Sequence, residues 1–149
     1  MHKIAFLAAL AAFSATPALA AGEARIEGRG GIAFAGGGSE AYAGIAAGYD
    51  FDLGDKAFAG VEGSADKILI DGSKVFFGAG ARVGLKAGEK TKLYVNGGIA
   101  FNGDGSDPFI GAGIQRKFGS SFYGKIEYRR FISNGTDLNF AGVGFGLTF

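Results

Sequence analysis

Charged residues recur at every second position in parts of this chain, and paired carboxylates and cations are the groups that general acid–base sites use. One run alternates cations and carboxylates near the start, a second does so near the end, and two single charges stand among glycines and small apolar residues between them. The eight candidates are Arg25, Glu27, Arg29, Glu62, Arg82, Lys125, Glu127 and Arg129. Such charges could have one of three roles: catalysis, conduction of ions, or mutual neutralisation inside the fold.

The first twenty residues have the composition of an export leader. Lys3 supplies a short basic start, residues 4–13 are apolar, and Ala18-Leu19-Ala20 is a small-residue cleavage site. The apolar stretch is too short to cross ~30 Å of hydrocarbon as a helix, so a membrane anchor is the weaker interpretation. We therefore expect residues 1–20 to be a signal peptide cleaved after Ala20, and residues 21–149 to form one domain.

Cleavage would remove the only histidine, His2, and with it much of the available chemistry. The chain has no cysteine, and loss of Lys3 reduces its 15 Lys and Arg residues to 14, equal to its 14 Asp and Glu residues. Histidine-based nucleophile activation and histidine-ligated metals both need an imidazole. We expect no catalytic residues, no metal and no cofactor. The balanced charge also excludes the basic surface of a nucleic-acid-binding protein.

Two short motifs are similar to ligand-binding loops but lack the necessary context. Gly78, Gly80 and Gly84 are spaced like part of a nucleotide-binding fingerprint, but no helix follows whose N-terminus could hold a phosphate. Residues 102–107 are rich in oxygen ligands, but no Glu stands at the twelfth position of a calcium loop. We interpret the first motif as part of a strand and the second as a turn.

The elements that must position the charges are strands, because the main periodicity of residues 21–149 is two. Over residues 75–86 the odd positions are all apolar, whereas the even positions carry three glycines, Phe76, Arg82 and Lys86. Glycine and turn-forming residues divide the chain into eight such segments. The expected strands are residues 24–34, 40–51, 56–66, 74–86, 92–101, 108–118, 121–132 and 138–149.

A soluble barrel and a membrane barrel both show this alternation, and the position of the charges distinguishes them. All eight candidates lie in mid-strand on the polar face and are interleaved with glycine. The narrow interior of an eight-stranded barrel suits small residues and paired charges. The opposite face, rich in Val, Ile, Leu, Phe and Ala, would then contact lipid. The sequence predicts an all-β, eight-stranded, antiparallel up-and-down transmembrane β-barrel.

The last strand ends Phe145-Gly146-Leu147-Thr148-Phe149. With the leader and the eight alternating segments, this ending resembles the small eight-stranded outer-membrane barrels of Gram-negative bacteria, which are porin-like or similar to the OmpA transmembrane domain and OmpX. The resemblance implies that Phe145, Leu147 and Phe149 form the signal that the barrel-assembly machinery reads. It also implies location in the cell outer membrane, with lipids and lipopolysaccharide as neighbours. The short breaks between strands differ from the long loops of adhesive family members.

An even number of strands places both ends of the domain on one side of the membrane, expected to be the periplasm. Turns near 52–55, 87–91 and 118–121 would lie there, and 35–39, 67–73, 102–107 and 133–137 would be surface loops. A lipid-side aromatic girdle is expected near the periplasm. Lumen-facing aromatics would close the two mouths: Phe58, Tyr94 and Tyr123 at one, and Tyr42, Phe76, Phe109 and Phe140 at the other.

Mutual neutralisation is the simplest role for the eight charges, because a buried charge is tolerated when it is paired. We therefore expect a monomeric outer-membrane protein with a side-chain-filled lumen and a structural or interfacial role in the envelope. The alternative is a narrow porin-like channel for ions or small solutes, running through the same charges.

Overall fold

The computed structural model describes residues 21–149, and the predicted leader lies outside these residues. They form eight strands and no helix. The strands are β1 (Gly22–Ala35), β2 (Gly38–Leu53), β3 (Ala57–Ile68), β4 (Val75–Lys86), β5 (Thr91–Phe101), β6 (Ser106–Phe118), β7 (Phe122–Phe131) and β8 (Leu138–Thr148). Within the described part of the chain, no helix is long and apolar enough to cross a membrane.

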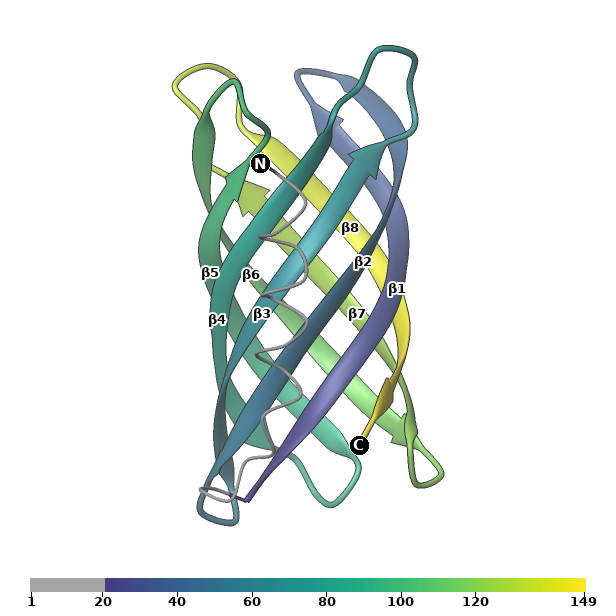
Figure 1. Ribbon diagram of the computed structural model, residues 1–149, viewed down its shortest axis with the longest axis vertical. Helices are drawn as coiled ribbons and strands as arrows, with labels where there is room; N and C mark the ends of the chain where they lie inside the picture. Colours follow the sequence, from purple (N-terminus) through teal and green to yellow (C-terminus); the bar gives the residue numbers. More distant parts are fainter. Residues whose placement is uncertain (1–20) are drawn as a thin grey trace, which may run out of the picture.

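Every strand pairs antiparallel with its sequence neighbours, and β1 also pairs with β8, so the sheet is a closed barrel. The strands are long and steeply tilted, and β1 begins at the same end at which β8 finishes (Figure 1). We call this the terminal end; it carries the connections 54–56, 87–90 and 119–121. The opposite, loop end carries 36–37, 69–74, 102–105 and 132–137. The eight-stranded antiparallel fold predicted from the alternation is therefore confirmed.

Several strands run further than their alternation indicated. The expected surface loop at 35–39 is a two-residue hairpin, because β1 extends to Ala35 and β2 begins at Gly38. Gly36 and Gly37 both have positive φ, at 55° and 91°. Two such residues in succession form the tight turn that matches the twist of paired strands, and glycine adopts it without steric strain. The predicted loop 67–73 is likewise shortened by β3, which continues to Ile68.

The two faces of the barrel wall have opposite chemistry. Large apolar side chains point outward and are exposed along all eight strands, as Ile45 (61%), Leu85 (61%) and Phe145 (68%) illustrate. The inward face is composed of glycine, charged residues and aromatics, and it contains nearly all the buried side chains. The inside of this barrel is therefore its polar side.

Glycine makes room for the large inward side chains. A Cβ at Gly48 would lie 2.8 Å from Nη2 of Arg25, and one at Gly144 would lie 3.1 Å from the Lys125 stem. Both glycines are at inward-facing positions of their strands, between residues that point outward. Because they have no side chain, each leaves a gap on the inner wall. The arginine and lysine side chains fill these gaps, as expected for a barrel whose interior is only just wide enough for side chains.

Candidate functional site: the charged lumen

All eight charges singled out in the sequence point into the lumen. Seven are buried, and Glu62 is the most accessible, with 14% of its side chain exposed. They come from four strands: β1 and β7 contribute three each, and β3 and β4 contribute one each. They meet because the wall closes on itself.

 A fifth strand, β2, joins the cluster through a ninth charge, Asp50. Four strands thus carry the eight candidates themselves, and β2 carries a partner that they need.

Two buried carboxylates that sequence reasoning left out of the cluster, Asp50 and Asp66, complete it. Asp50 accepts hydrogen bonds from Nε and Nη2 of Arg82, at 2.9 and 2.6 Å. Asp66 accepts the same pair of bonds from Arg29, at 2.8 and 2.6 Å. Both arrangements are bidentate, the geometry in which arginine and carboxylate bind most strongly. Period two did place both aspartates on the inner face, but it contains no information about which cation lies across the barrel.

Glu62 connects Arg25 and Arg29, the first and last of the three inward charges on β1. Its carboxylate lies 2.7 Å from Nη2 of Arg25 and 2.9 Å from Nη1 of Arg29. Across the lumen, Lys125 contacts Glu27 at 2.5 Å and Glu127 at 3.1 Å. The cluster is therefore continuous across the barrel from β3 through β1 to β7.

Aromatic hydroxyls and an amide also donate hydrogen bonds to Glu27 and Glu127. Tyr123 donates to Glu27 at 2.5 Å, Tyr94 donates to Glu127 at 2.7 Å, and Asn96 donates to the same oxygen of Glu127 at 3.3 Å. A buried carboxylate is tolerated when it is hydrogen-bonded and faces a cation. These carboxylates are therefore arranged to neutralise cations.

The inner cluster is balanced in charge. Its five cations are Arg25, Arg29, Arg82, Lys125 and Arg129, and its five carboxylates are Glu27, Asp50, Glu62, Asp66 and Glu127. We call these ten residues the inner cluster. Five positive and five negative charges give it no net charge, which is the condition under which so many ionised groups can share a narrow interior.

Toward the loop end, the inner cluster is covered by an aromatic cap of Tyr42, Phe76, Phe109, Phe131 and Phe140. The rings of Tyr42 and Phe140 stack with centroids 4.4 Å apart, and Phe131 lies 4.9 Å from Phe140. The guanidinium of Arg129 lies 5.4 Å from the Phe140 ring, which joins the cap to the charges. Phe131 was missing from the predicted set for this mouth; it shares the inward parity of Arg129 on β7.

At the terminal end, residues 21–149 form no such cap. Phe58, Tyr94 and Tyr123, the aromatics expected at this mouth, lie deeper, with 1%, 4% and 1% of their surfaces exposed. Arg82 lies 4.7 Å from the Tyr94 ring and 5.4 Å from the Phe58 ring, so these aromatics pack within the inner cluster. The prediction that they would close the mouth was wrong, because the inward-facing Lys86, Lys92 and Lys117 of β4, β5 and β6 lie further out and line an open space.

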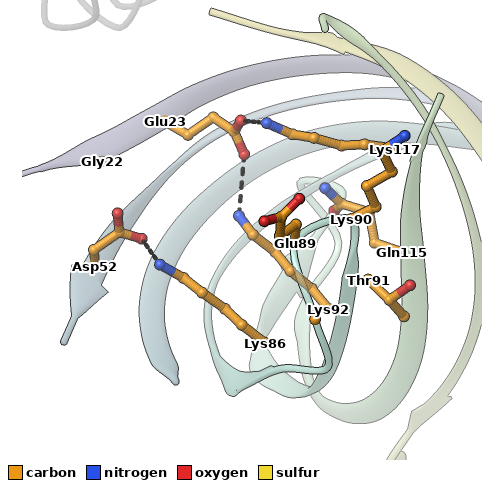
Figure 2. A pocket seen from close by; sticks show the side chains of 11 residues that line it. Gly22, Glu23, Asp52, Lys86, Glu89, Lys90, Thr91, Lys92, Gln115 and Lys117 are labelled. Atoms are coloured by element: carbon orange, nitrogen blue, oxygen red, sulfur yellow. Dashed lines mark hydrogen bonds and ion pairs between the residues drawn. The ribbon is translucent and has the colours of Figure 1, made fainter. Parts of the chain in front are cut away.

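A polar cavity of about 210 Å³ lies at the terminal end, outside these aromatics (Figure 2). We call it the vestibule. Lys86, Lys92 and Lys117 extend into it from β4, β5 and β6, and Gln115 lies at its inner side. The lysines contact carboxylates: Lys86 lies 2.7 Å from Asp52, whereas Lys92 (3.1 Å) and Lys117 share Glu23. Residues 21–149 contain no group of three or more side chains placed to hold a metal ion.

The barrel was compared with known proteins. No family model and no curated protein sequence matches the chain. Among solved structures, the N-terminal β-barrel domain of Pseudomonas aeruginosa OprF is 18% identical, with 85% of this chain and 97% of that one covered and a TM-score of 0.58. Ail, the attachment invasion locus protein of Yersinia pestis, is 14% identical, with 88% and 100% covered and a TM-score of 0.63.

Two further solved structures, one natural and one designed, have the same fold. Neisserial surface protein A is 12% identical, with 86% of this chain and 97% of that chain covered and a TM-score of 0.58. A transmembrane β-barrel designed de novo is 17% identical, with 83% and 94% covered and a TM-score of 0.55. At these identities the likeness concerns the fold: the chain has the architecture of small eight-stranded outer-membrane barrels.

Proposed function

We propose that this protein spans the bacterial outer membrane as a monomeric barrel with a filled lumen, and that its role in the envelope is structural or interfacial. The observation that carries the proposal is the reversed distribution of polarity. Ten charges lie inside the barrel, whereas large apolar side chains are exposed around its outside. Water would disfavour such an exterior, and a bilayer would bury it.

The outward side chains also form a band of the kind that a bilayer requires. Near the terminal end, the exposed aromatics Phe51, Phe118 and Phe122 surround the barrel, and Phe149 is 73% exposed. Near the loop end, Tyr128 is exposed on the same outer face, and its hydroxyl donates to Asn139 at 2.5 Å. Aromatic girdles at both interfaces characterise outer-membrane barrels, so these rings support a transmembrane position.

In this proposal the terminal end faces the periplasm, and the hairpins of the loop end face outward. The leader delivers the chain across the inner membrane, and Phe145, Leu147 and Phe149 on β8 act as the signal for the barrel-assembly machinery. Phe145 and Phe149 are exposed on the outside of the folded barrel, at 68% and 73%. Arg130 lies on the outer face near the loop end and pairs with Asp137, in reach of lipopolysaccharide phosphates.

Cell fractionation tests the location. The proposal predicts recovery in the outer-membrane fraction, with a folded form that migrates faster on gels than the boiled form. A folded protein recovered in the soluble periplasmic fraction would overturn the membrane assignment. Loss of outer-membrane protein on Phe149→Ser, with normal folding of the same variant into vesicles in vitro, would separate the assembly signal from the fold.

The second candidate function is a narrow ion path, and one observation favours it. Some buried donors of the cluster, Nη1 of Arg82 and Nη2 of Arg129, have no hydrogen-bond partner among residues 21–149. Buried polar groups that find no partner within the protein are commonly hydrogen-bonded to water. A file of such waters would allow ions to pass, and measurement of conductance distinguishes this function from the filled lumen.

A further inference from the structure

The vestibule differs from the inner cluster in its charge. Its wall carries three cations, Lys86, Lys92 and Lys117, against two carboxylates, Glu23 and Asp52. The turn residues Glu89 and Lys90 add one charge of each sign. Because the inner cluster beneath it is neutral, one positive charge at this mouth has no counterpart in the lumen.

The surplus positive charge lies around Glu23, where two lysines share one carboxylate. Both Lys92 and Lys117 contact its carboxylate, one at each oxygen, as Figure 2 shows. Lys92 has a second acceptor in Asp50, 2.7 Å away, but that carboxylate already accepts two bonds from Arg82. Two ammonium groups therefore depend on carboxylates that other cations also use.

A buried donor lies on the same side of the vestibule. Gln115 is only 1% exposed, and its Oε1 accepts a hydrogen bond from Nη2 of Arg82 at 3.0 Å. Since a guanidinium can only donate, this bond fixes which end of the amide is oxygen. The other end of the amide is therefore Nε2. It makes no side-chain hydrogen bond found within residues 21–149 and is not among their fully enclosed unpartnered atoms, so it is accessible from the vestibule that Gln115 lines.

We propose that the vestibule binds one small oxyanion, a carboxylate or a phosphate group, between Gln115 Nε2 and the ammonium groups of Lys92 and Lys117. The ligand would supply the missing negative charge and accept a hydrogen bond from the side-chain amide of Gln115. A cavity of about 210 Å³ admits such a group together with a short attached chain. This inference goes beyond the proposed function, and binding does not require the lumen to conduct.

Titration of the isotope-labelled protein by NMR tests the proposal. The protein is held in an uncharged maltoside detergent, which carries no phosphate, and inorganic phosphate or acetate is added at an ionic strength kept constant with sodium chloride. Saturable shifts of the Gln115 side-chain amide and of the Lys92 and Lys117 signals are expected. Uniform, non-saturating shifts that include Lys67 and Lys74 at the far end would overturn the proposal.

Three substitutions have expected effects that differ in sign. Gln115→Glu keeps the acceptor for Arg82 but replaces the free N–H by a negative oxygen, and it should abolish binding. Lys117→Gln should weaken binding about tenfold, the usual effect of losing a charged hydrogen-bond partner. Glu23→Gln removes the carboxylate that the two lysines share, and it should strengthen binding. Each variant is checked for folding by its gel migration.

Lys74→Gln is the matched control, because Lys74 pairs with Asp104 at the loop end and is exposed. It should leave the affinity unchanged. Equal affinities for the wild type, the control and all three vestibule variants would contradict the site. A separate arm in phosphatidylglycerol nanodiscs without added phosphate identifies the source: shifts already present there show that a lipid phosphate fills the site, and shifts only on addition show a free anion.

Discussion

Two ion pairs in this barrel have the same length, but one is buried and the other is exposed. Comparing them isolates the effect of burial from the effect of distance. Nη2 of Arg29 lies 2.6 Å from Asp66, with about 1% of either side chain exposed, whereas Nζ of Lys74 lies 2.6 Å from Asp104, with 60% and 66% exposed. Water screens the second pair and competes for its hydrogen bonds. Only in the first pair does removal of one partner leave an uncompensated charge in the buried interior.

Neutralising the buried partner should therefore be far more damaging than neutralising the exposed one. We expect Asp66→Asn to lower the free energy of unfolding by about 3–5 kcal/mol, because Arg29 loses its bidentate partner and the inner cluster is left with one uncompensated buried positive charge. Asp104→Asn should cost under about 1 kcal/mol. Urea titration in lipid vesicles measures both, and equal losses would show that the inner cluster does not stabilise the barrel.

The inner cluster also shows what the sequence can and cannot predict at the residue scale. Parity along each strand placed all eight candidate charges on one face, and all eight point into the lumen. Asp50 and Asp66 were omitted because their importance comes from Arg82 and Arg29, which are more than thirty residues away in sequence. Such contacts depend on the register between strands and on closure of the sheet, which no local pattern specifies.

At the scale of the strand, inner and outer glycines have different roles. A Cβ on Gly48 would lie 2.5 Å from the backbone oxygen of Val61 and 2.8 Å from Nη2 of Arg25, whereas one on Gly28 would have no neighbour within 4 Å. We expect Gly48→Ala to destabilise the barrel by about 1–3 kcal/mol through overpacking. Gly28→Ala should have little effect in the same unfolding titration. If the two variants were equally stable, Gly48 would not be making room for the Val61 backbone and Arg25.

The outer face of β7 gives a second comparison within one strand. Ile126 and Phe122 are similarly exposed, at 63% and 65%, but Ile126 lies at mid-strand and Phe122 at the terminal end. In a bilayer, Ile126→Arg should cost about 2–4 kcal/mol and Phe122→Arg about 0–1 kcal/mol. On a water-exposed surface both would change stability by less than about 0.5 kcal/mol. Unfolding in vesicles therefore reports directly on whether this face meets lipid.

Strand ends were the least predictable elements. Alternation of apolar and polar residues identified all eight strands, but it stops where both faces become polar, as it does over Gly38–Glu40 at the start of β2. The barrel wall continues there because backbone pairing does not need an apolar face. This is also why the vestibule was not foreseen: Lys86, Lys92 and Lys117 stand near strand ends, and only closure brings them together.

At the scale of the whole molecule, the lumen is divided into three layers. The aromatic cap lies toward the loop end, the neutral inner cluster fills the middle, and the vestibule opens at the terminal end. Eight-stranded barrels have little interior space to spare, and here side chains from every layer cross it. The arrangement favours a closed barrel whose surfaces, rather than its lumen, contact the rest of the envelope.

Single-channel recording in planar bilayers tests this closure most directly, with insertion verified by the heat-dependent gel shift of the same preparation. The filled lumen predicts no steady conductance steps from the wild-type protein. Asp66→Asn, which disturbs the inner cluster, should at most add brief, irregular events. Steady steps from the wild type that disappear when Arg82 or Glu62 is neutralised would contradict the filled lumen and establish the ion path in its place.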